Sequence, residues 1–310
     1  MSNILSIQNL QNVFVTNSSI ISDKGEIIKS SCVSEEAYKV SQTLKFRFKY
    51  FFPLFSFKKK TYILITDEWS KNYCHWLWEA LSKLIIIKEK FPEATLLLPK
   101  SYLKINFIMK SLEVFGFNQN NILTIPGKSR LRVKNLAMIF CISILTPGYY
   151  AFLKFREVSQ ALLSYHQKNL KTNFGERIYI SRSNPKRSTI RKATNEAEVT
   201  KLLVNYNFKI VYMEDFSFLE QISISNSAKF IVAPHGAGIT NVMFSEPTCH
   251  LVELVNKKWS KTCFAEMCDK VGIDYHRIDC LATQADKTVE VSDIAINVED
   301  LEKKLIEILR

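Results

Sequence analysis

The sequence of 310 residues has few features of a membrane-spanning or disulfide-bonded protein. Its longest apolar runs, such as Leu84 to Ile87 and Phe51 to Phe57, are far shorter than the ~20 residues that span a bilayer. No basic segment followed by an apolar stretch opens the chain, and its seven cysteines include no Cys-x-x-Cys pair. We therefore expect a cytoplasmic protein with reduced thiols.

Common catalytic and metal-binding motifs are also missing. The sequence contains no Asp-x-Asp, His-Glu-x-x-His, Gly-x-x-x-x-Gly-Lys-[Ser/Thr] or Gly-x-Ser-x-Gly. Neither a divalent metal held by paired carboxylates nor another bound cofactor is expected. If the protein binds a diphosphate, we expect arginines and a helix end to balance its charge.

Glycine is scarce, with eight residues, yet two of them stand in the run Gly236-Ala237-Gly238. The run connects an expected strand to a short expected helix, where free backbone N–H groups and the positive helix end can bind an anion. Glycine there allows close backbone approach and unusual dihedral angles, and His235 lies at the end of the strand. An ordinary strand-to-helix turn would also explain the run. The dinucleotide fingerprint Gly-x-Gly-x-x-Gly is absent, which disfavours a dehydrogenase.

The chain has the composition and length of a soluble protein with two domains. Apolar residues make up 47% and charged residues 23%. Short β-branched runs alternate with amphipathic stretches, which is typical of parallel-sheet α/β domains. We predict two Rossmann-like domains, residues 1–150 and 176–310, joined by a helix over 151–175. The expected strands are 62–66, 94–98, 122–125, 131–140, 177–181, 208–212, 229–233, 251–255 and 275–278. The expected helices are 73–90, 102–115, 150–170, 259–271, one between Asn195 and Tyr206, one after Ser217 and one from Val298. Asn195 with Glu198, and Ser217 with Glu220, have the spacing of helix N-caps.

The net charge of +12 is uneven along the chain. Residues 1–150 contain 20 Lys and Arg against 10 Asp and Glu, whereas residues 151–310 contain 22 against 20. The positive field of the first half would suit an anionic partner such as nucleic acid, a phospholipid surface or a phosphate-bearing substrate. A lysine-rich surface that keeps the protein in solution is the alternative.

Within that half, Lys45 to Lys60 (KFRFKYFFPLFSFKKK) alternates cations with aromatic residues. The alternation predicts an edge strand whose phenylalanines face the core. The alternative is an interfacial patch with aromatic rings at the depth of lipid headgroups and cations on anionic lipid.

A second cluster, residues 181–196, contains several cations in a loop after an expected strand. Arg182, Arg187 and Arg191 could bind phosphate oxygens in a bidentate manner. The loop is expected at the same sheet edge as the glycine run, which favours phosphate binding over a merely solvated loop.

A third cluster, residues 72–81, contains His75 and Glu79 at positions i and i+4 of an expected helix. The two side chains would share one face, and together they could remove the proton of a hydroxyl nucleophile. A structural histidine beside a surface glutamate is the alternative.

The three clusters together resemble glycosyltransferase family 61. The hallmark of that family, Pro-His-Gly-Ala-Gly-[Leu/Met]-Thr-Asn followed by an aliphatic Glu-Leu, is similar to Pro234–Asn241 (PHGAGITN) and Leu251–Leu254 (LVEL). The bacterial N-terminal pattern Asn-Tyr-x-His-Trp-Leu-x-[Asp/Glu] is similar to Asn72–Glu79 (NYCHWLWE). The middle patterns are similar to Tyr179–Arg182 (YISR) and Arg191–Glu196 (RKATNE). The resemblance covers about residues 62–255, with a loop after Arg182 that is about three residues longer than the family's.

The resemblance implies a GT-B fold, in which two Rossmann-like domains face each other across a cleft. The N-terminal domain would bind the acceptor, and the C-terminal domain the nucleotide sugar. It also implies an inverting, metal-independent transferase with a donor such as a UDP-sugar. Glu79 would be the general base, with His75 as its orienting partner or substitute. Arg182 with Arg187 or Arg191 would bind the diphosphate, and Glu253 the ribose. The implied donor-binding residues are Arg182, Arg187, Arg191, Asn195, His235, Gly236, Ala237, Gly238, Asn241 and Glu253.

From the bacterial branch of the family we expect sugar transfer to a capsular or other surface polysaccharide. The acceptor would be an oligosaccharide or a lipid-linked glycan, and the enzyme would be cytoplasmic, with peripheral contact to the inner membrane. A nucleotide-sugar epimerase of GT-B fold is one alternative. A basic nucleic-acid-binding protein is another, but no recognition helix or stacking motif supports it.

Overall fold

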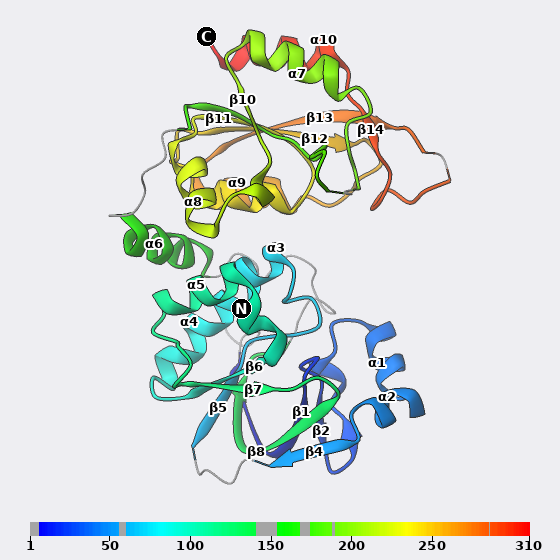
Figure 1. Ribbon diagram of the computed structural model, residues 1–310, viewed down its shortest axis with the longest axis vertical. Helices are drawn as coiled ribbons and strands as arrows, with labels where there is room; N and C mark the ends of the chain where they lie inside the picture. Colours follow the sequence, from blue (N-terminus) through cyan, green and yellow to red (C-terminus); the bar gives the residue numbers. More distant parts are fainter. Residues whose placement is uncertain (1–5, 56–59, 141–153, 168–173, 188–189, 285) are drawn as a thin grey trace. The chain divides into compact units, whose positions relative to one another are not determined.

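The computed structural model describes residues 6–55, 60–140, 154–167, 174–187, 190–284 and 286–310 (Figure 1). The chain divides into two compact units, Met1–Leu162 and Leu163–Arg310. Helix α6 (Phe155–His166) contains the division and covers the described part of the helix expected over 150–170. No helix in the described ranges is long and apolar enough to cross a bilayer.

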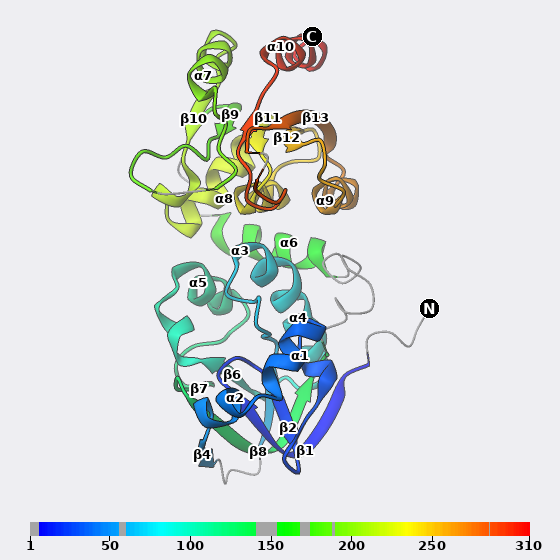
Figure 2. The ribbon, with the colours of Figure 1, turned by 90° about the vertical axis from the view of Figure 1, so that its right-hand side faces the viewer.

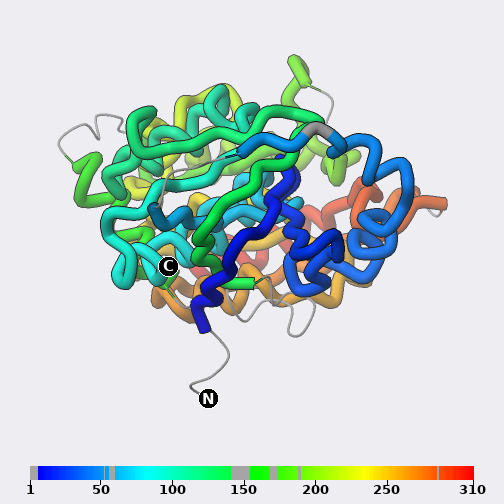
Figure 3. The backbone as a smooth tube through the Cα atoms, turned by 90° about the horizontal axis from the view of Figure 1, so that it is seen from below, coloured from blue at the N-terminus to red at the C-terminus, as the bar shows by residue number. Residues whose placement is uncertain are grey.

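Unit 1 contains a mixed sheet with the strand order β3-β2-β1-β8-β5-β6-β7, and β4 also pairs with β8. The strands β4 to β8 run parallel where they pair, whereas β1, β2 and β3 are antiparallel to their neighbours. Figure 3 shows β1 beside β8. The strands are β1 (Gln8–Thr16), β2 (Ile21–Asp23), β3 (Glu26–Ile27), β4 (Phe52–Phe55), β5 (Thr61–Leu64), β6 (Thr95–Pro99), β7 (Ile122–Ile125) and β8 (Ser129–Met138).

The α/β class is thus confirmed, but the first unit is more than a Rossmann-like half. The antiparallel strands β1, β2 and β3 are absent from the sequence-based prediction. Their burial shows why they were hard to find. In β1 only Val13 and Val15 are buried members of the apolar core, Leu10 packs against it while partly buried, and the rest of the first half of the strand is largely exposed. A strand this polar is specified by its pairing with β8 rather than by its own pattern.

The segment expected as an edge strand is a helix. Residues Leu44–Lys49 form α2, and Thr43 caps the helix by accepting a hydrogen bond from the backbone N–H of Phe46 at 3.2 Å. The strand prediction was therefore wrong for these residues, because a local cap and the preceding α1 (Glu35–Ser41) override the short alternation. The pairing strand β4 begins only at Phe52. Residues 56–59 of the segment lie outside the described ranges.

The long helix expected over 73–90 is present in three pieces. It begins as α3 (Tyr73–His75), passes through a π-helical segment (Trp76–Ala80) and continues as α4 (Leu81–Lys90). Its core side is apolar, and Trp76, Leu77, Leu81 and Leu84 are fully buried. A 3-10 helix (Lys100–Lys104) and α5 (Asn106–Val114) form the helical segment expected over 102–115.

Unit 2 contains a sheet with the order β10-β9-β11-β12-β13-β14, parallel except for the last strand. Helices α7 and α10 cover one face, and α8 and α9 cover the other (Figures 1 and 2). This is the doubly wound architecture that the sequence predicts for this half. The strands are β9 (Arg177–Ile180), β10 (Lys209–Val211), β11 (Phe230–Pro234), β12 (His250–Asn256), β13 (Asp274–Ala282) and β14 (Ile294–Ala295). The helices are α7 (Glu196–Asn205), α8 (Phe218–Ser227), α9 (Cys263–Val271) and α10 (Val298–Ile308).

The caps of unit 2 agree only in part with the predicted signatures. Ser217 and Glu220 form the expected capping box at the start of α8. Asn195 occupies the N-cap position of α7, but its side chain caps nothing. It accepts a hydrogen bond from the backbone N–H of Ile296 at 3.1 Å and donates one to the carbonyl of the same residue at 2.8 Å. Tertiary contact with the chain before α10 thus replaces the local cap.

Candidate functional site

In unit 1 the third cluster, residues 72–81, follows the segment that leaves the carboxyl end of β5. The order of the sheet places β8, the last strand of the unit, on the opposite side of β5 from β6 and β7. At such a reversal, ligands bind beyond the carboxyl ends of the strands in open α/β sheets. The chain continues from β5 to Asp67 and then into α3, whose N-cap Asn72 accepts a hydrogen bond from the backbone N–H of Cys74 at 3.0 Å.

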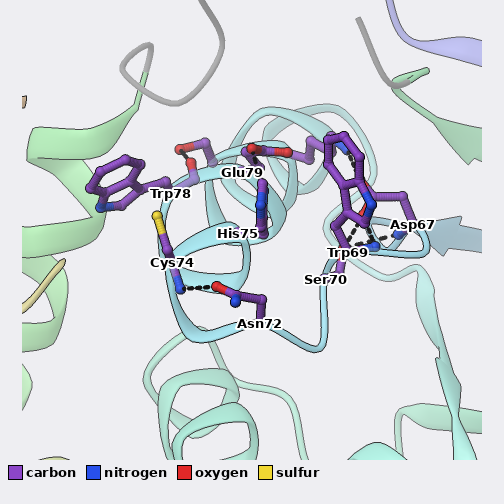
Figure 4. Close-up of polar contacts among 10 residues, drawn as sticks. Asp67, Trp69, Ser70, Asn72, Cys74, His75, Trp78 and Glu79 are labelled. Carbon is purple, nitrogen blue, oxygen red and sulfur yellow. Dashed lines mark hydrogen bonds and ion pairs between the residues drawn. The ribbon is translucent and has the colours of Figure 1, made fainter. Parts of the chain in front are cut away.

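His75 and Glu79 form the pair that their spacing predicts. Nδ1 of His75 lies 2.7 Å from Oε1 of Glu79, and the two side chains are 31% and 17% exposed. Figure 4 shows them next to each other on the helix, with Trp78 pointing away. Burial lowers the pKa of His75, but the hydrogen bond and charge of Glu79 outweigh it, so the pKa is raised above its ordinary value. The glutamate therefore stands beside a histidine that holds a proton readily, and both remain within reach of solvent.

The pair lies on a π-helical segment, which is a rare conformation frequent at functional sites. The ring of Trp69 lies 5.3 Å from the ring of His75, and Trp69 is 43% exposed. The partly exposed ring of Trp69 therefore forms an aromatic surface beside His75.

A buried ion pair supports this region. The ammonium of Lys83 lies 3.1 Å from Oδ2 of Asp67, and both side chains are buried. Oδ1 of Asp67 accepts hydrogen bonds from the hydroxyl of Ser70 at 2.8 Å and from the backbone N–H of Trp69 at 3.0 Å. Burial raises the pKa of Asp67, but Lys83 and Ser70 reverse the effect, and the pKa lies below its ordinary value. Sequence reasoning did not single out Asp67, Trp69 or Lys83.

Glu68, which follows Asp67 in the chain, has a carboxyl group whose two oxygens are not both hydrogen-bonded. Its Oε2 accepts a hydrogen bond from the backbone N–H of Val33 at 3.2 Å. Its Oε1 is buried without a hydrogen-bond partner in the described part of the chain. Burial, with a contribution from the charge of Asp67, raises the pKa of Glu68 to about 7. This carboxyl therefore titrates near neutral pH, close to the His75–Glu79 pair in the sequence.

In unit 2 the glycine run Gly236–Gly238 and the second cluster, residues 181–196, lie next to each other. Arg182 follows β9 and the glycine run follows β11, and these two strands are neighbours in the sheet. The order β10-β9-β11 reverses between them, which is where doubly wound sheets bind ligands. The contact is direct, because a Cβ added to Gly236 would lie 1.9 Å from Nη1 of Arg182. The guanidinium therefore occupies the space that a side chain at position 236 would need.

Of the two reasons predicted for glycine here, the structure supports close approach and not an unusual dihedral angle. Gly236 has φ 168°, an extended conformation that any residue adopts, so its backbone does not require glycine. Close approach of Arg182 does. At Gly238 a Cβ would meet the methyl group Cγ2 of Ile180 at 3.0 Å, which is also closer than ordinary van der Waals contact. The helix that follows, Ala237–Phe244, is a 3-10 helix.

The two remaining arginines of the second cluster lie in different places. The guanidinium of Arg191 lies 5.7 Å from the ring of Trp259. Burial and the charge of Arg191 lower the pKa of Arg182 to about 10, which leaves both groups charged at neutral pH. Arg187 instead donates a hydrogen bond to the carbonyl of Glu214 at 3.0 Å and lies 3.7 Å from Asp215. The structure therefore gathers Arg182 and Arg191 and directs Arg187 elsewhere.

Two buried N–H donors belong to Arg191 and to the neighbouring Trp259. Nε of Arg191 and Nε1 of Trp259 are buried and have no hydrogen-bond partner among the residues described. Arg191 also has φ 59°, a left-handed conformation that is costly for a residue other than glycine. A small pocket there is lined by Arg191, His235, Asn256, Trp259, Ser292 and Ile294, among others. Unsatisfied donors and a strained arginine are typical of a binding site.

His235 is held by Glu253 and two aromatic rings. Nδ1 of His235 is hydrogen-bonded to Oε1 of Glu253, whose Oε2 accepts a hydrogen bond from the hydroxyl of Tyr275. The ring of His235 lies 4.2 Å from that of Trp259 and 5.1 Å from that of Phe264. Because a carboxylate accepts the Nδ1 proton, Nε2 is the nitrogen left for another partner.

The arrangement gives Glu253 partners that the sequence did not predict. Its side chain is buried, and both of its oxygens are engaged within the protein. A direct contact with ribose is therefore not supported, and positioning of His235 is. Tyr275 was not singled out from the sequence, because its contact with Glu253 depends on the pairing of β12 with β13.

The other predicted donor-binding residues have structural partners. Asn195 is engaged with Ile296, as described above. Asn241 is buried and donates hydrogen bonds to Oε1 of Gln221 at 3.1 Å and to the carbonyl of Gly238 at 3.3 Å. It therefore supports the glycine turn from behind. Ala237 begins the 3-10 helix within the same turn.

The described residues contain no group of three His, Cys, Asp or Glu side chains that could hold a metal ion. The charges that the structure brings together at the β9–β11 edge are cationic. Such a site can bind an anion with its own side chains and backbone N–H groups.

Comparison with known proteins identifies the family of the chain. The sequence model of the family described as glycosyltransferase 61 matches residues 73–252. This range includes His75, Glu79 and His235 and ends one residue before Glu253. No curated protein matches the chain.

Proposed function

The chain belongs to glycosyltransferase family 61, and we propose that it transfers a sugar from a nucleotide-activated donor to a hydroxyl of a capsular or other surface polysaccharide, with inversion at the anomeric carbon. The proposed donor is a UDP-sugar, and the acceptor is an oligosaccharide or a lipid-linked glycan. The proposed place of action is the cytoplasm beside the inner membrane.

The observation that carries the donor site is the meeting of Arg182, Arg191 and the Gly236–Gly238 turn at the switch point of the second sheet. Two cations whose charges repel each other are stabilised by a dianionic or trianionic ligand. Nε of Arg191 and Nε1 of Trp259 supply further donors for phosphate oxygens. We propose that the diphosphate binds here without a divalent metal.

The chemistry follows from the two histidine–glutamate pairs. The acceptor oxygen forms a bond to the anomeric carbon while the bond from that carbon to the phosphate oxygen breaks, and the diphosphate leaves with the electron pair. Glu79 takes the proton of the acceptor hydroxyl, and His75 orients its carboxylate. The arginines stabilise the charge that develops on the leaving group, and Nε2 of His235 donates to a phosphate or sugar oxygen.

This mechanism needs the acceptor hydroxyl and the donor sugar in one place. The GT-B arrangement of the two units is therefore part of the proposal, with unit 1 binding the acceptor and unit 2 the donor.

A binding experiment tests the donor site. We expect UDP-, GDP-, CMP- or TDP-sugars to raise the melting temperature by several degrees at about 100 times Kd, without added metal. Arg182→Gln and Arg191→Gln should weaken binding of the responding sugar by about 10- to 100-fold, because each removes a charge-assisted hydrogen bond. Arg187→Gln is the matched control, since it removes an equal charge from the same loop.

Failure of all four sugar classes to raise the melting temperature would contradict the donor site, and so would an Arg187→Gln variant as weak as Arg191→Gln. Transfer to an added glycan distinguishes the proposal from epimerisation, which would yield an isomerised nucleotide sugar and no glycan product.

A further inference from the structure

A long stretch of unit 1 is free of acidic residues. Residues 37–66 contain seven Lys and Arg and no Asp or Glu. The stretch includes the helix α2 and the strand β4, which lie at one end of the unit (Figures 1 and 2). The stretch itself therefore presents no carboxylate to a negatively charged partner.

The α2 helix has two different faces. Phe46, Arg47 and Tyr50 line a pocket together with Arg130 of β8. Phe46 and Tyr50, one turn apart, have ring centres separated by 4.6 Å. These contacts fix the inward side of the helix.

The outward side combines apolar and cationic residues. At 100° per residue, Leu44, Lys45, Phe48 and Lys49 fall on one side of the helix. Leu44 is 71% and Phe48 is 73% exposed, the two highest values among the exposed large apolar side chains of the described residues. Phe51 continues this surface with 61% exposure and Val40 with 54%. We call these six residues the α2 face.

The lysines of the α2 face carry charges that no carboxylate of the described residues pairs with. Neither Lys45 nor Lys49 forms an ion pair with a described residue, and Lys49 lies over the ring of Tyr50. On the neighbouring strand β8, Arg132 and Lys134 are also exposed. The exposed cations of this part of unit 1 are thus contributed by β8 as well as by α2.

We propose that the α2 face docks onto a membrane surface of anionic phospholipid. Leu44, Phe48 and Phe51 enter the region between headgroups and acyl chains, and Lys45 and Lys49 contact the lipid phosphates. Val40 and Leu44 offer no ring on which a base could stack, so this mixture of aliphatic side chains, phenylalanines and lysines suits lipid better than nucleic acid. Docking does not depend on the proposed sugar transfer.

Vesicle binding tests this inference. The full chain is sedimented with vesicles of phosphatidylcholine containing about 30% phosphatidylglycerol, and with vesicles of phosphatidylcholine alone. We expect binding to the anionic vesicles only, and weaker binding at high salt. Lys45→Gln/Lys49→Gln should reduce the partition coefficient by about 25-fold, or about fivefold per cation. Leu44→Ser/Phe48→Ser should reduce it by at least about tenfold.

The matched control is Lys201→Gln/Val204→Ser on the exposed side of α7, which removes one cation and one apolar side chain from unit 2. It should leave vesicle binding unchanged. Each variant is compared by its melting curve, so that loss of folding is recognised. Because the α2 face is exposed, we expect all variants to fold.

Three outcomes would overturn the inference. The first is equal binding to both kinds of vesicle, and the second is a loss in the α7 control as large as in the α2 variants. The third is binding to soluble polyphosphate that needs Lys45 and Lys49 while Leu44→Ser/Phe48→Ser has no effect on vesicles. That result would assign the surface to a soluble polyanion.

Discussion

Each unit of the protein holds a histidine whose Nδ1 is hydrogen-bonded to a glutamate, but the two pairs are built differently. His75 and Glu79 come from one helix, four residues apart, and both are partly exposed. His235 and Glu253 come from neighbouring parallel strands, are 11% and 5% exposed, and include Tyr275 as a third member. The first pair is local and open, and the second is tertiary and closed.

The difference in exposure suits the two pairs to different roles. A partly exposed carboxylate can receive a proton from a substrate, whereas a buried one with two internal partners can only position its neighbour. The same two residue types therefore suit a base in unit 1 and a fixed binding group in unit 2. Substitutions in the two pairs should therefore have different effects, with loss of activity in unit 1 and loss of stability in unit 2.

The largest expected effect is on catalysis in the open pair. Glu79→Gln should lower kcat by about 10²- to 10⁴-fold, because it removes the proposed base. The free energy of unfolding should change by less than about 1 kcal/mol, since an exposed i,i+4 pair contributes little. Steady-state kinetics and urea unfolding measure the two quantities. A variant that keeps more than about a tenth of normal turnover would remove Glu79 from this role.

The closed pair should respond in stability. Glu253→Ala leaves Nδ1 of His235 and the hydroxyl of Tyr275 without their acceptor inside the protein, which should cost about 3 kcal/mol of unfolding free energy. Glu253→Gln keeps an oxygen and an amide and should recover most of that loss. Urea unfolding of both variants provides the test. Equal losses in the two variants would mean that these hydrogen bonds do not hold the site.

Glu68 adds a partly buried carboxyl whose Oε1 has no hydrogen-bond partner in the part of the chain that the structure describes. Its pKa of about 7 lies above its ordinary 4.5, so the folded protein keeps this proton to a higher pH than the unfolded chain does. The resulting stability is fully present below about pH 4.5 and is lost as the pH rises through 7. Glu68→Gln, which cannot ionise, should be more stable than the natural protein by about 1–2 kcal/mol at pH 8, after allowance for partial exposure.

The two proteins should have similar unfolding free energies at pH 4.5 and diverge above it. Urea unfolding across this range measures the difference. A constant difference at all pH values would show that the carboxyl does not titrate in this range.

The smallest expected effect concerns the proton of His75. Its raised pKa depends on Glu79, so Glu79→Gln should lower that pKa, because burial then acts with less opposition. The stability that the pair contributes is greatest below the ordinary pKa of histidine, near 6.5, and is lost as the pH rises through the folded value. Ring chemical shifts of His75 across pH, followed by NMR, measure the change.

The sequence predicted the open pair because helical periodicity is local. Four residues on one helix fix which side chains meet, whatever the rest of the fold does. The closed pair could be predicted only as two separate motifs. Their contact depends on the parallel register in which Ala233 lies beside Glu253 and Pro234 beside Leu254. The choice between Arg187 and Arg191 likewise had no local signal, because it depends on which loop approaches Trp259.

The errors have the same physical origin. The alternation over residues 45–50 reads as a strand, yet the Thr43 cap makes it a helix, and the polar strand β1 was not predicted at all. In both cases tertiary partners or caps outweigh the intrinsic pattern of a short segment.

By itself the sequence determined the α/β class, the order of most strands and helices, the His75–Glu79 pair and the family resemblance, since all of these follow from patterns within a few residues. Tertiary structure alone decided that Arg182 fills the space beside Gly236 and that Arg191 lies over Trp259. It alone decided that Glu253 serves His235. These contacts join strand ends that are tens of residues apart, and only the pairing of the strands brings such ends together.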